Sequence, residues 1–210
     1  MSISRDDQAT ARRRSGRTKR ERTRTALLKA AADVFGKRGW AGSRLEDIAR
    51  AAGSSVPTTY NHFPGGKQEL IGVVYRPLLG PLLTAVEADI AAEVDPTEAV
   101  VRHVHRLTDL ARREQQLTFT MLAAAHEQTI RVGQPTETND VRSLVPMTRP
   151  LIDLIAYGQT RGSFASHPPA FEVGAYHTNA LLIRLTSRPH ETADATAELV
   201  LSQLLPALRK

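Results

Sequence analysis

Short polar side chains that suit hydrogen bonding to DNA bases are concentrated in the stretch 56–63. Thr58, Thr59 and Asn61 carry groups that can contact base edges, and the methyl groups of Val56 can contact thymine methyl groups. The major groove of double-stranded DNA admits an α-helix, so these side chains must stand on a helix to reach the bases. The stretch is therefore predicted to be a base-reading helix.

A second set of residues around this stretch offers contacts to phosphate. Tyr60 and His62 can donate hydrogen bonds to phosphate oxygens. Lys67, near the start of the following helix, adds a positive charge beside N–H groups that favour anions. An ordinary helical hairpin with a solvated polar face is the alternative, because short motifs also match by chance.

Two predicted helices joined by a tight turn would hold these residues in place. Ser43 and Glu46 have the spacing of a capping box at the start of the first helix. Gly53 allows the chain to turn with a positive φ. Ser55 is a good N-cap for the second helix, and Pro57 is tolerated in its first turn. The pattern is that of a helix-turn-helix unit, whose second helix enters the major groove.

A further helix, predicted from Arg24 to Lys37, precedes this unit and ends near Gly39. Trp40, the only tryptophan, is expected to fill the core between helices rather than to stack on bases. The expected small core of the three helices consists of Leu27, Ala31, Phe35, Leu45, Ile48, the ring of Tyr60, and Phe63.

Positive charge is concentrated at the N-terminal end of the chain. The net charge is +6, and residues 1–24 hold nine Lys or Arg against three Asp or Glu, whereas residues 68–210 hold thirteen against sixteen. A polyanion is the partner that this asymmetry favours. Residues 1–24 contain too little apolar surface for a core, so we expect a disordered basic arm.

Enzyme chemistry finds little support in the sequence. The chain has no cysteine, which excludes disulfides and thiolate metal sites and fits a reducing, cytoplasmic location. It has no nucleophile-elbow, P-loop or dinucleotide-binding motif. His103 and His105 would point about 200° apart on a helix and cannot share a metal. We expect no catalytic residue, no metal, no cofactor and, because no apolar run approaches about 20 residues, no membrane partner.

The remainder of the chain is predicted to be entirely helical, which makes the fold class all-α. The expected helices are 67–93, 97–114, 116–132, 140–161, 168–187 and 191–208. Pro77 and Pro81 fall inside the first of these, which leaves open two shorter helices in its place. Pro146 and Pro150 are expected to kink the fourth, and such kinks can open a cavity between helices.

Residues 25–70 resemble the DNA-binding domain of the TetR family of transcriptional regulators. The matching residues are Ala30, Ala31, Phe35, Gly39, Ser43, Ile48, Ala49, Ala52, Gly53, Ser55, Tyr60, His62, Phe63 and Lys67. Three features depart from the family pattern, namely Ser54, Thr59 and the longer loop at Gly65-Gly66. After the basic arm at 1–24, the resemblance implies a helix-turn-helix domain at 25–66 and a ligand-binding and dimerisation domain at 67–210.

The residues expected to contact DNA are Ser43, Arg44, Ser55, Val56, Pro57, Thr58, Thr59, Tyr60, Asn61, His62 and Lys67. The resemblance also implies a homodimer formed through the last two helices. The apolar faces of those helices, with His177 beside them, make the expected dimer interface, unless these faces only pack inward. The expected interface residues are Val173, His177, Ala180, Leu181, Leu185, Ala195 and Leu199.

The resemblance further implies a small-molecule pocket in the helical domain. A pocket is mostly apolar with a few polar groups, although each candidate taken alone is more readily explained as a plain core residue. The candidates are Phe119, Met121, Leu122, His126, Met147, Leu151, Tyr157 and Asn179. As a set they favour an apolar or aromatic effector.

The sequence thus predicts a ligand-responsive transcriptional regulator, and it favours a repressor over an activator. It would bind a near-palindromic operator as a dimer and leave it when a small molecule binds. An architectural DNA-binding protein without a ligand is one alternative, and an all-helical enzyme with a DNA-binding appendage is another.

Overall fold

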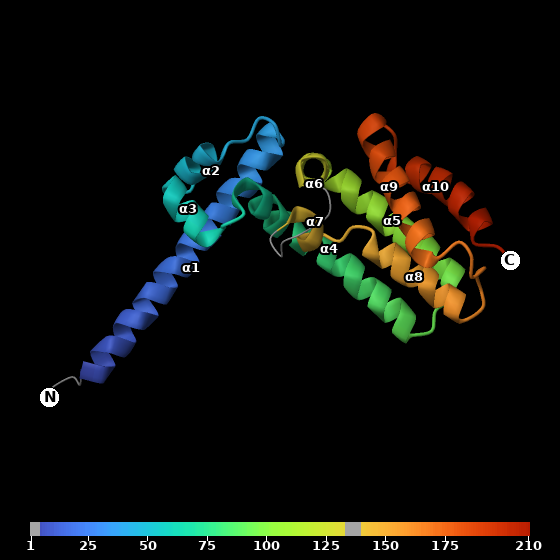
Figure 1. Ribbon diagram of the computed structural model, residues 1–210, viewed down its shortest axis with the longest axis horizontal. Helices are drawn as coiled ribbons and strands as arrows, with labels where there is room; N and C mark the ends of the chain where they lie inside the picture. The colour runs from blue at the N-terminus through green and yellow to red at the C-terminus, as the bar shows by residue number, and fades with distance from the viewer. Residues whose placement is uncertain (1–4, 133–139) are drawn as a thin grey trace.

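The computed structural model describes the backbone of residues 5–132 and 140–210, and the side chains of 16–131 and 140–210. Every regular element in these residues is a helix, which confirms the predicted all-α fold (Figure 1). A small N-terminal group of helices, α1 to α3, lies at one end of the molecule. A larger helical group, ending in α9 and α10, lies at the other end.

Helix α1 spans Arg5–Arg38, α2 spans Leu45–Ala51, and α3 spans Val56–His62. The N-terminal half of α1 projects away from the other helices as a rod. The expectation of a disordered arm at 1–24 is corrected for residues 5–24, which continue the helix. Ala, Arg, Lys, Gln and Glu dominate this segment, and all are strong helix formers. Residues 1–4 lie outside the described part.

Helix α4, Gly66–Ala91, joins the two groups. It runs unbroken through Pro77 and Pro81, so the alternative of two shorter helices is wrong. By length and composition alone, α4 is long and apolar enough to cross a membrane. The expectation from the sequence did not include such a segment, because it considered only uninterrupted apolar runs. Yet 44% of that window is buried inside the protein, and Leu70, Ile71 and Tyr75 belong to the core. The apolar residues of α4 therefore serve packing.

The larger group consists of α5 (Pro96–Arg113), α6 (Gln115–Val132), α7 (Val141–Leu144), α8 (Arg149–Thr160), α9 (Ala170–Ser187) and α10 (Ala193–Ala207). The predicted helix 140–161 is two helices, α7 and α8, instead of one kinked helix. Pro146 lies in the interruption, and Pro150 lies in the first turn of α8, where its missing N–H costs little.

Helix α5 is the centre of this group, because α4, α8, α9 and α10 all pack against it. Asp89 on α4 is largely buried and pairs with Arg102 at 3.3 Å and with Arg106 at 3.0 Å, both on α5. These ion pairs fasten the connecting helix to the larger group, so α4 forms a firm link between the two ends of the molecule.

Candidate DNA-binding surface and ligand cavity

The turn between α2 and α3 forms as its residues predict. Gly53 has a φ of +63°, and the backbone N–H of Ser54 donates to the carbonyl of Ala49 at 2.8 Å. Ser55 caps α3, since its hydroxyl oxygen accepts the backbone N–H of Thr58 at 3.2 Å. Pro57 lies in the first turn of α3. The turn and the cap hold α3 at a fixed angle to α2, as the helix-turn-helix motif requires.

Ser43 has a different role from the one expected. The N-cap of α2 is Arg44, and no side chain caps the helix, so the predicted capping box is absent. The Ser43 hydroxyl donates to the carbonyl of Gly39 at 2.5 Å, and the residue is buried. The chain turns inward at the end of α1, which removes Ser43 from the residues that can touch DNA. Arg44, beside it, is exposed.

Helix α3 presents most, but not all, of its expected contact residues to solvent. Ser55, Pro57, Tyr60 and Asn61 are exposed, and Val56, Thr58 and His62 are partly exposed. Thr59 is fully buried and its hydroxyl donates to the carbonyl of Ser55 at 3.0 Å, so it cannot read a base. The residue that departs from the family pattern in this helix is therefore part of the core.

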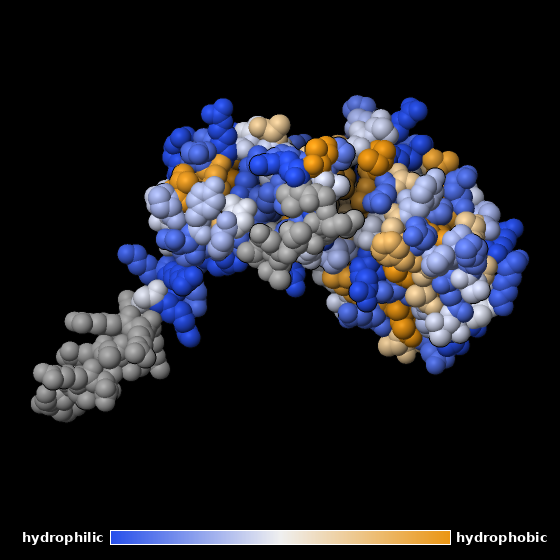
Figure 2. All heavy atoms as spheres, in the orientation of Figure 1, coloured by the Kyte–Doolittle hydropathy of each residue, from blue (hydrophilic) through white to orange (hydrophobic). Residues whose placement is uncertain are grey.

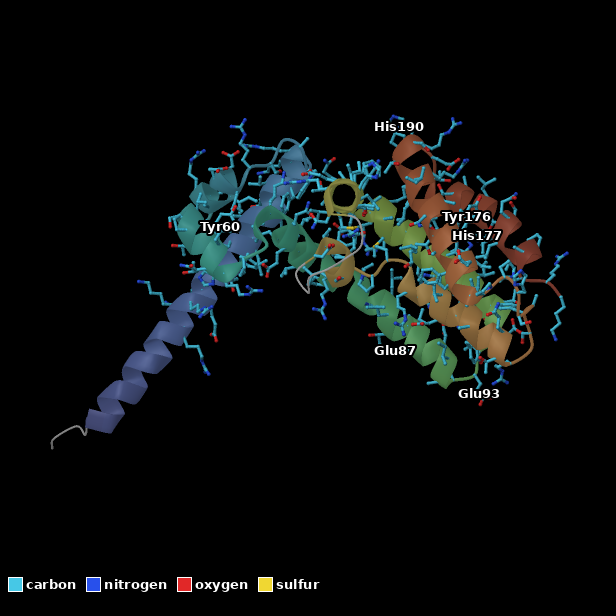
Figure 3. All side chains as sticks on the ribbon, in the orientation of Figure 1. Tyr60, Glu87, Glu93, Tyr176, His177 and His190 are labelled. Atoms are coloured by element: carbon cyan, nitrogen blue, oxygen red, sulfur yellow. The ribbon has the colours of Figure 1, made fainter. Side chains whose placement is uncertain are left out.

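Tyr60, which Figure 3 labels on the N-terminal domain, is 50% exposed, and this corrects its expected place in the core. Its ring lies against Gly66, which has a φ of +60°. A Cβ atom at Gly66 would come within 3.1 Å of that ring. The glycine thus lets the tyrosine ring rest on the start of α4, with half of its surface still open to a phosphate.

Lys67 points into the protein instead of toward a phosphate. Its Nζ donates to the carbonyls of Trp40 at 3.0 Å and Ser43 at 3.1 Å, and lies 3.7 Å from the centroid of the Trp40 ring. Burial lowers the pKa of Lys67, and Glu127 partly opposes this shift. Lys67 therefore connects the start of α4 to the loop after α1 through hydrogen bonds, and it is not available for the expected contact with phosphate.

Two arginines of α1, Arg20 and Arg24, also lie beside α3; Arg20 belongs to the expected basic arm, whereas Arg24 was not among the expected DNA contacts. Arg24 donates to the carbonyl of His62 at 2.9 Å, and its guanidinium lies 4.2 Å from the centroid of the Phe63 ring. Burial lowers the pKa of His62, and the charges of Arg20 and Arg24 lower it further. Their spacing of four residues on one helix was the available signal. The described end of the α1 rod next to α3 is covered by hydrophilic side chains (Figure 2).

A cavity of about 580 Å³ lies between α6, the segment around α7, and α9. Six of the eight candidate pocket residues line it: Phe119, Met121, Leu122, His126, Met147 and Asn179. Leu151 is instead buried in the core, and Tyr157 donates through its hydroxyl to the carbonyl of Val94 at 3.1 Å, away from the cavity. Sequence reasoning thus brought together residues from three separate segments, namely α6, the segment between α7 and α8, and α9.

The cavity wall also contains an arginine that was not predicted. Arg142 pairs with Asp140 at 2.7 Å and donates to the hydroxyl of Thr129 at 3.2 Å. The hydrogen bond from Arg142 is the main reason that the pKa of Asp140 is lowered. Because Asp140 balances the charge of Arg142, the wall combines apolar surface with hydroxyl, imidazole and amide groups, and carries little net charge.

The expected dimer residues divide between the inside and the outside of the chain. Val173, His177, Leu181 and Leu185 are buried among the chain's own helices, so this face of α9 packs inward and is no interface. Ala180 on α9 and Ala195 and Leu199 on α10 are exposed. The exposed apolar side chains that the sequence did not single out on α9 are Phe171, Tyr176 and Ile183.

Among the described residues, no group of three or more His, Asp or Glu side chains could hold a metal ion. The exposed part of α3, the cavity, and the exposed apolar face of α9 and α10 are features of the described residues to which a binding function can be attached.

A model of the family described as bacterial regulatory proteins, tetR family, matches residues 27–74. The transcriptional activator FasR of Mycolicibacterium smegmatis is 31% identical over 104 residues, which cover 50% of this chain and 47% of that protein. The transcriptional repressor NicS of Pseudomonas putida is 29% identical over 149 residues, covering 69% and 66%. The chain thus spans about half of FasR and about two thirds of NicS.

Solved structures share the fold at low identity. FadR of Thermus thermophilus, a repressor in complex with lauroyl-CoA, aligns with a TM-score of 0.70 at 19% identity and covers 89% of this chain and 95% of its own. RolR in complex with resorcinol aligns with a TM-score of 0.63 at 18% identity, covering 91% and 89%. The helix-turn-helix domain is thus that of the tetR family of bacterial regulatory proteins, and the chain as a whole shares the fold of these solved structures.

Proposed function

We propose that this protein is a transcriptional repressor that binds a near-palindromic operator as a homodimer and is released by a small apolar or aromatic molecule. The observation that carries the proposal is the combination, in one chain, of an exposed helix-turn-helix surface and an apolar cavity of about 580 Å³. Neither feature alone would distinguish a ligand-responsive regulator from an architectural DNA-binding protein.

Helix α3 is the proposed recognition helix. Asn61 and Thr58 would contact base edges, whereas Tyr60, Arg44 and the basic residues of α1 would contact phosphates. In a dimer the two recognition helices must enter successive major grooves, which are about 34–36 Å apart. The proposed operator is therefore a near-palindrome with half-sites about one helical turn apart.

The cavity is the proposed effector site. Its volume falls within the range of ordinary small-molecule sites, which are mostly apolar with a few polar groups that orient the ligand. Phe119, Met121 and Leu122 would surround the apolar body of the ligand, and His126 and Asn179 would bond its polar group. FadR and RolR, which share the fold, were crystallised with lauroyl-CoA and with resorcinol. The lauroyl chain of the first ligand and the aromatic ring of the second support an effector with an apolar or aromatic body.

The exposed face of α9 and α10 is the proposed dimer interface. Tyr176 is 70% exposed and Ile183 is 66% exposed, and both lie on α9 with a spacing of seven residues. Leu199 and Ala195 extend the apolar surface onto α10. Two such helices and their symmetry mates would form a four-helix interface of the isologous kind.

Release from DNA requires the effector to bind one arrangement of the dimer better than the other. Nearly complete release needs a preference of about 5 kcal/mol between the two arrangements. Among the relatives, NicS is a repressor and FasR an activator, so both signs of regulation occur. For this protein we propose repression.

A selection of bound sequences from a random DNA library, carried out at two salt concentrations, tests the proposal. The expected result is an enriched palindrome with half-sites about one turn apart. Salt-sensitive binding with no enriched sequence would contradict it and favour an architectural protein. With the operator known, a gel shift in the presence of compounds that fit the cavity tests release.

A further inference from the structure

Helix α6 meets two different parts of the molecule with its two faces. One face lines the cavity, through residues that include Phe119, Leu122 and His126. The other face carries Thr120 and Glu127, which contact the N-terminal domain. Figure 1 shows α6 nearly end-on, between that domain and α9. Because protein interiors are close-packed, a shift of α6 on the cavity side must also be felt on the other side.

The strongest contact on the second face joins α6 to the loop after α1. The indole Nε1 of Trp40 donates to Oε2 of Glu127 at 2.5 Å. This hydrogen bond is also the main reason that the pKa of Glu127 is lowered, and Lys67 contributes through its charge. A second link is weaker, since the hydroxyl of Thr120 reaches the carbonyl of Phe35 at 3.4 Å.

Trp40 is itself connected to the start of the helix-turn-helix unit. Its ring stacks on Phe35, with 6.2 Å between the ring centroids. Lys67 lies over the indole ring, and its Nζ donates to the carbonyls of both Trp40 and Ser43. Ser43 directly precedes Arg44, the N-cap of α2. A displacement of Trp40 is therefore passed directly to the first residues of α2.

Helix α4 also joins the two groups, but one connecting helix does not by itself fix their relative orientation. It fixes the distance between the N-terminal domain and the larger helical group, and leaves rotation about its own axis to be fixed by other contacts. The contact between Trp40 and Glu127 adds a second connection, from the loop after α1 to α6. It has the position required to hold the domain in one rotational setting, and it ends on a wall of the cavity.

We infer that Trp40 and Glu127 are positioning residues: their contact sets the orientation of the helix-turn-helix domain on α6 and relays movement of the cavity wall to it. In the dimer this orientation sets the separation and the relative rotation of the two recognition helices. The inference rests on the proposed function, because that separation matters only when two copies bind one operator.

Operators with altered spacing provide the test. One base pair inserted at the centre of the selected operator moves the half-sites apart by about 3.4 Å and rotates them by about 35°. The wild-type protein is expected to lose at least tenfold in affinity for this DNA. Glu127→Ala is expected to lose less than threefold, with its half-site preference unchanged. A merely structural role would lower affinity for all spacings alike.

Two controls separate the effect of the hydrogen bond between Trp40 and Glu127 from the effect of the negative charge of Glu127. Glu127→Gln removes the same charge as Glu127→Ala but keeps an oxygen that can accept the indole N–H, so it should retain the wild-type spacing penalty. Arg131→Ala removes the other partner of Glu127, which lies 3.4 Å away on the solvent side, and should also behave as wild type. Trp40→Phe keeps a ring and removes the donor, so it should match Glu127→Ala.

The relay is tested from the cavity side. Ala125 lines the cavity on α6, and Ala125→Leu adds bulk there without a ligand. It should lower operator affinity about tenfold in the wild-type background and less than twofold in the Glu127→Ala background, with folding checked by circular dichroism. An equal loss in both backgrounds would refute the relay.

The remaining outcomes are equally decisive. If Glu127→Ala and Trp40→Phe both kept the full spacing penalty, the contact would have no positioning role, although the proposed function would stand. If the wild-type protein selected no palindrome, the proposed function would itself be wrong.

Discussion

His103 on α5 is almost fully buried, and neither of its ring nitrogens has a hydrogen-bond partner among the described residues. Burial lowers the pKa of His103 to about 4. The charge of Arg106 lowers it as well, whereas Asp89 opposes the shift. The imidazole is therefore held neutral in the fold at pH values where an exposed histidine would begin to take up a proton.

The free energy of unfolding should consequently fall in mild acid. In the unfolded chain His103 takes up a proton as the pH falls below 6.5, whereas the folded chain does so only near pH 4. The contribution of neutral His103 to the free energy of unfolding is therefore fully present above pH 6.5. It is lost as the pH falls from 6.5 to 4, and the loss is roughly 3 kcal/mol at most. Urea unfolding at pH 7 and at pH 5 measures the loss.

A matched pair of variants assigns this effect. His103→Leu removes the titrating group without breaking a hydrogen bond, so unfolding should become less dependent on pH over this range. His105→Gln, two residues away at a partly exposed position on the same helix, serves as the control. If both variants kept the wild-type dependence on pH, His103 would not be its source.

Asn61 and Arg44 are both exposed, but they should affect DNA binding differently. Asn61→Ala should cost about 1–3 kcal/mol on the preferred operator and relax the sequence preference, because a base contact is lost. Arg44→Ala should weaken binding to all sequences alike and reduce the salt slope by about one, because a phosphate contact is lost. Fluorescence anisotropy on matched and mismatched DNA at several salt concentrations separates the two effects.

Residue types alone could not decide which polar residues near the turn point outward. Ser55 caps α3 as predicted, because an N-cap is determined by its immediate neighbours. Ser43 and Lys67 have equally suitable types, but the fold turns both inward. Ser43 lies in the loop after α1 and bonds back to the carbonyl of Gly39 in the same loop. Lys67 meets this loop only through tertiary packing, which local sequence patterns do not contain.

At the scale of elements, close approach of two helices makes Gly174 sensitive to any side chain. A Cβ atom there would lie 2.7–2.9 Å from Ile152 on α8, including its backbone. Gly174→Ala should therefore destabilise the protein by about 1–3 kcal/mol. Gly80 in α4 has nothing within 4 Å of such an atom, and Gly80→Ala should stabilise the protein by up to about 1 kcal/mol.

Thermal melting of the two variants provides the comparison. For a chain of this size, 1 kcal/mol corresponds to a shift in Tm of about 2–4 °C. Opposite signs are expected, with a lower Tm for Gly174→Ala and a higher Tm for Gly80→Ala. A lower Tm for both would mean that the helical glycines matter through something other than the space around them.

The helices themselves were largely predictable, because their ends carry local signals. Asp95 caps α5 with an oxygen that accepts the N–H of Glu98 at 3.0 Å, and Thr192 caps α10 in the same way. Prolines were harder to interpret. Pro77 and Pro81 lie within an unbroken α4, whereas Pro146 lies between two helices. Whether packing on neighbouring helices offsets a lost backbone bond is not visible in the local sequence.

At the scale of the whole molecule, α9 shows why the outward face of a helix was assigned wrongly. Apolar residues surround this helix: Leu181 and Leu185 face inward, whereas Tyr176 and Ile183 face outward. A helix that is apolar on all sides gives no indication of which side meets the core and which meets a partner. Only the packing of α9 against α8 and α10 resolves the two faces.

The same distinction makes the proposed dimer testable by substitution. Tyr176→Arg places a charge on the exposed face of α9, where Figure 3 marks Tyr176, without disturbing the core. It should convert the dimer to a monomer in sizing chromatography at micromolar concentration and leave the helical content unchanged. Affinity for the palindrome should fall because one copy holds only a half-site.

Two further variants complete the comparison. Ile130→Arg alters a residue on α6 that is 72% exposed, so it tests the effect of adding arginine to an exposed apolar position outside the proposed interface. It should remain a dimer. Leu181→Arg should lose the fold, because it buries an unpaired charge within the chain. A dimeric Tyr176→Arg protein would show that the two copies associate through a different surface, and the spacing of the recognition helices would then have to be derived from that surface.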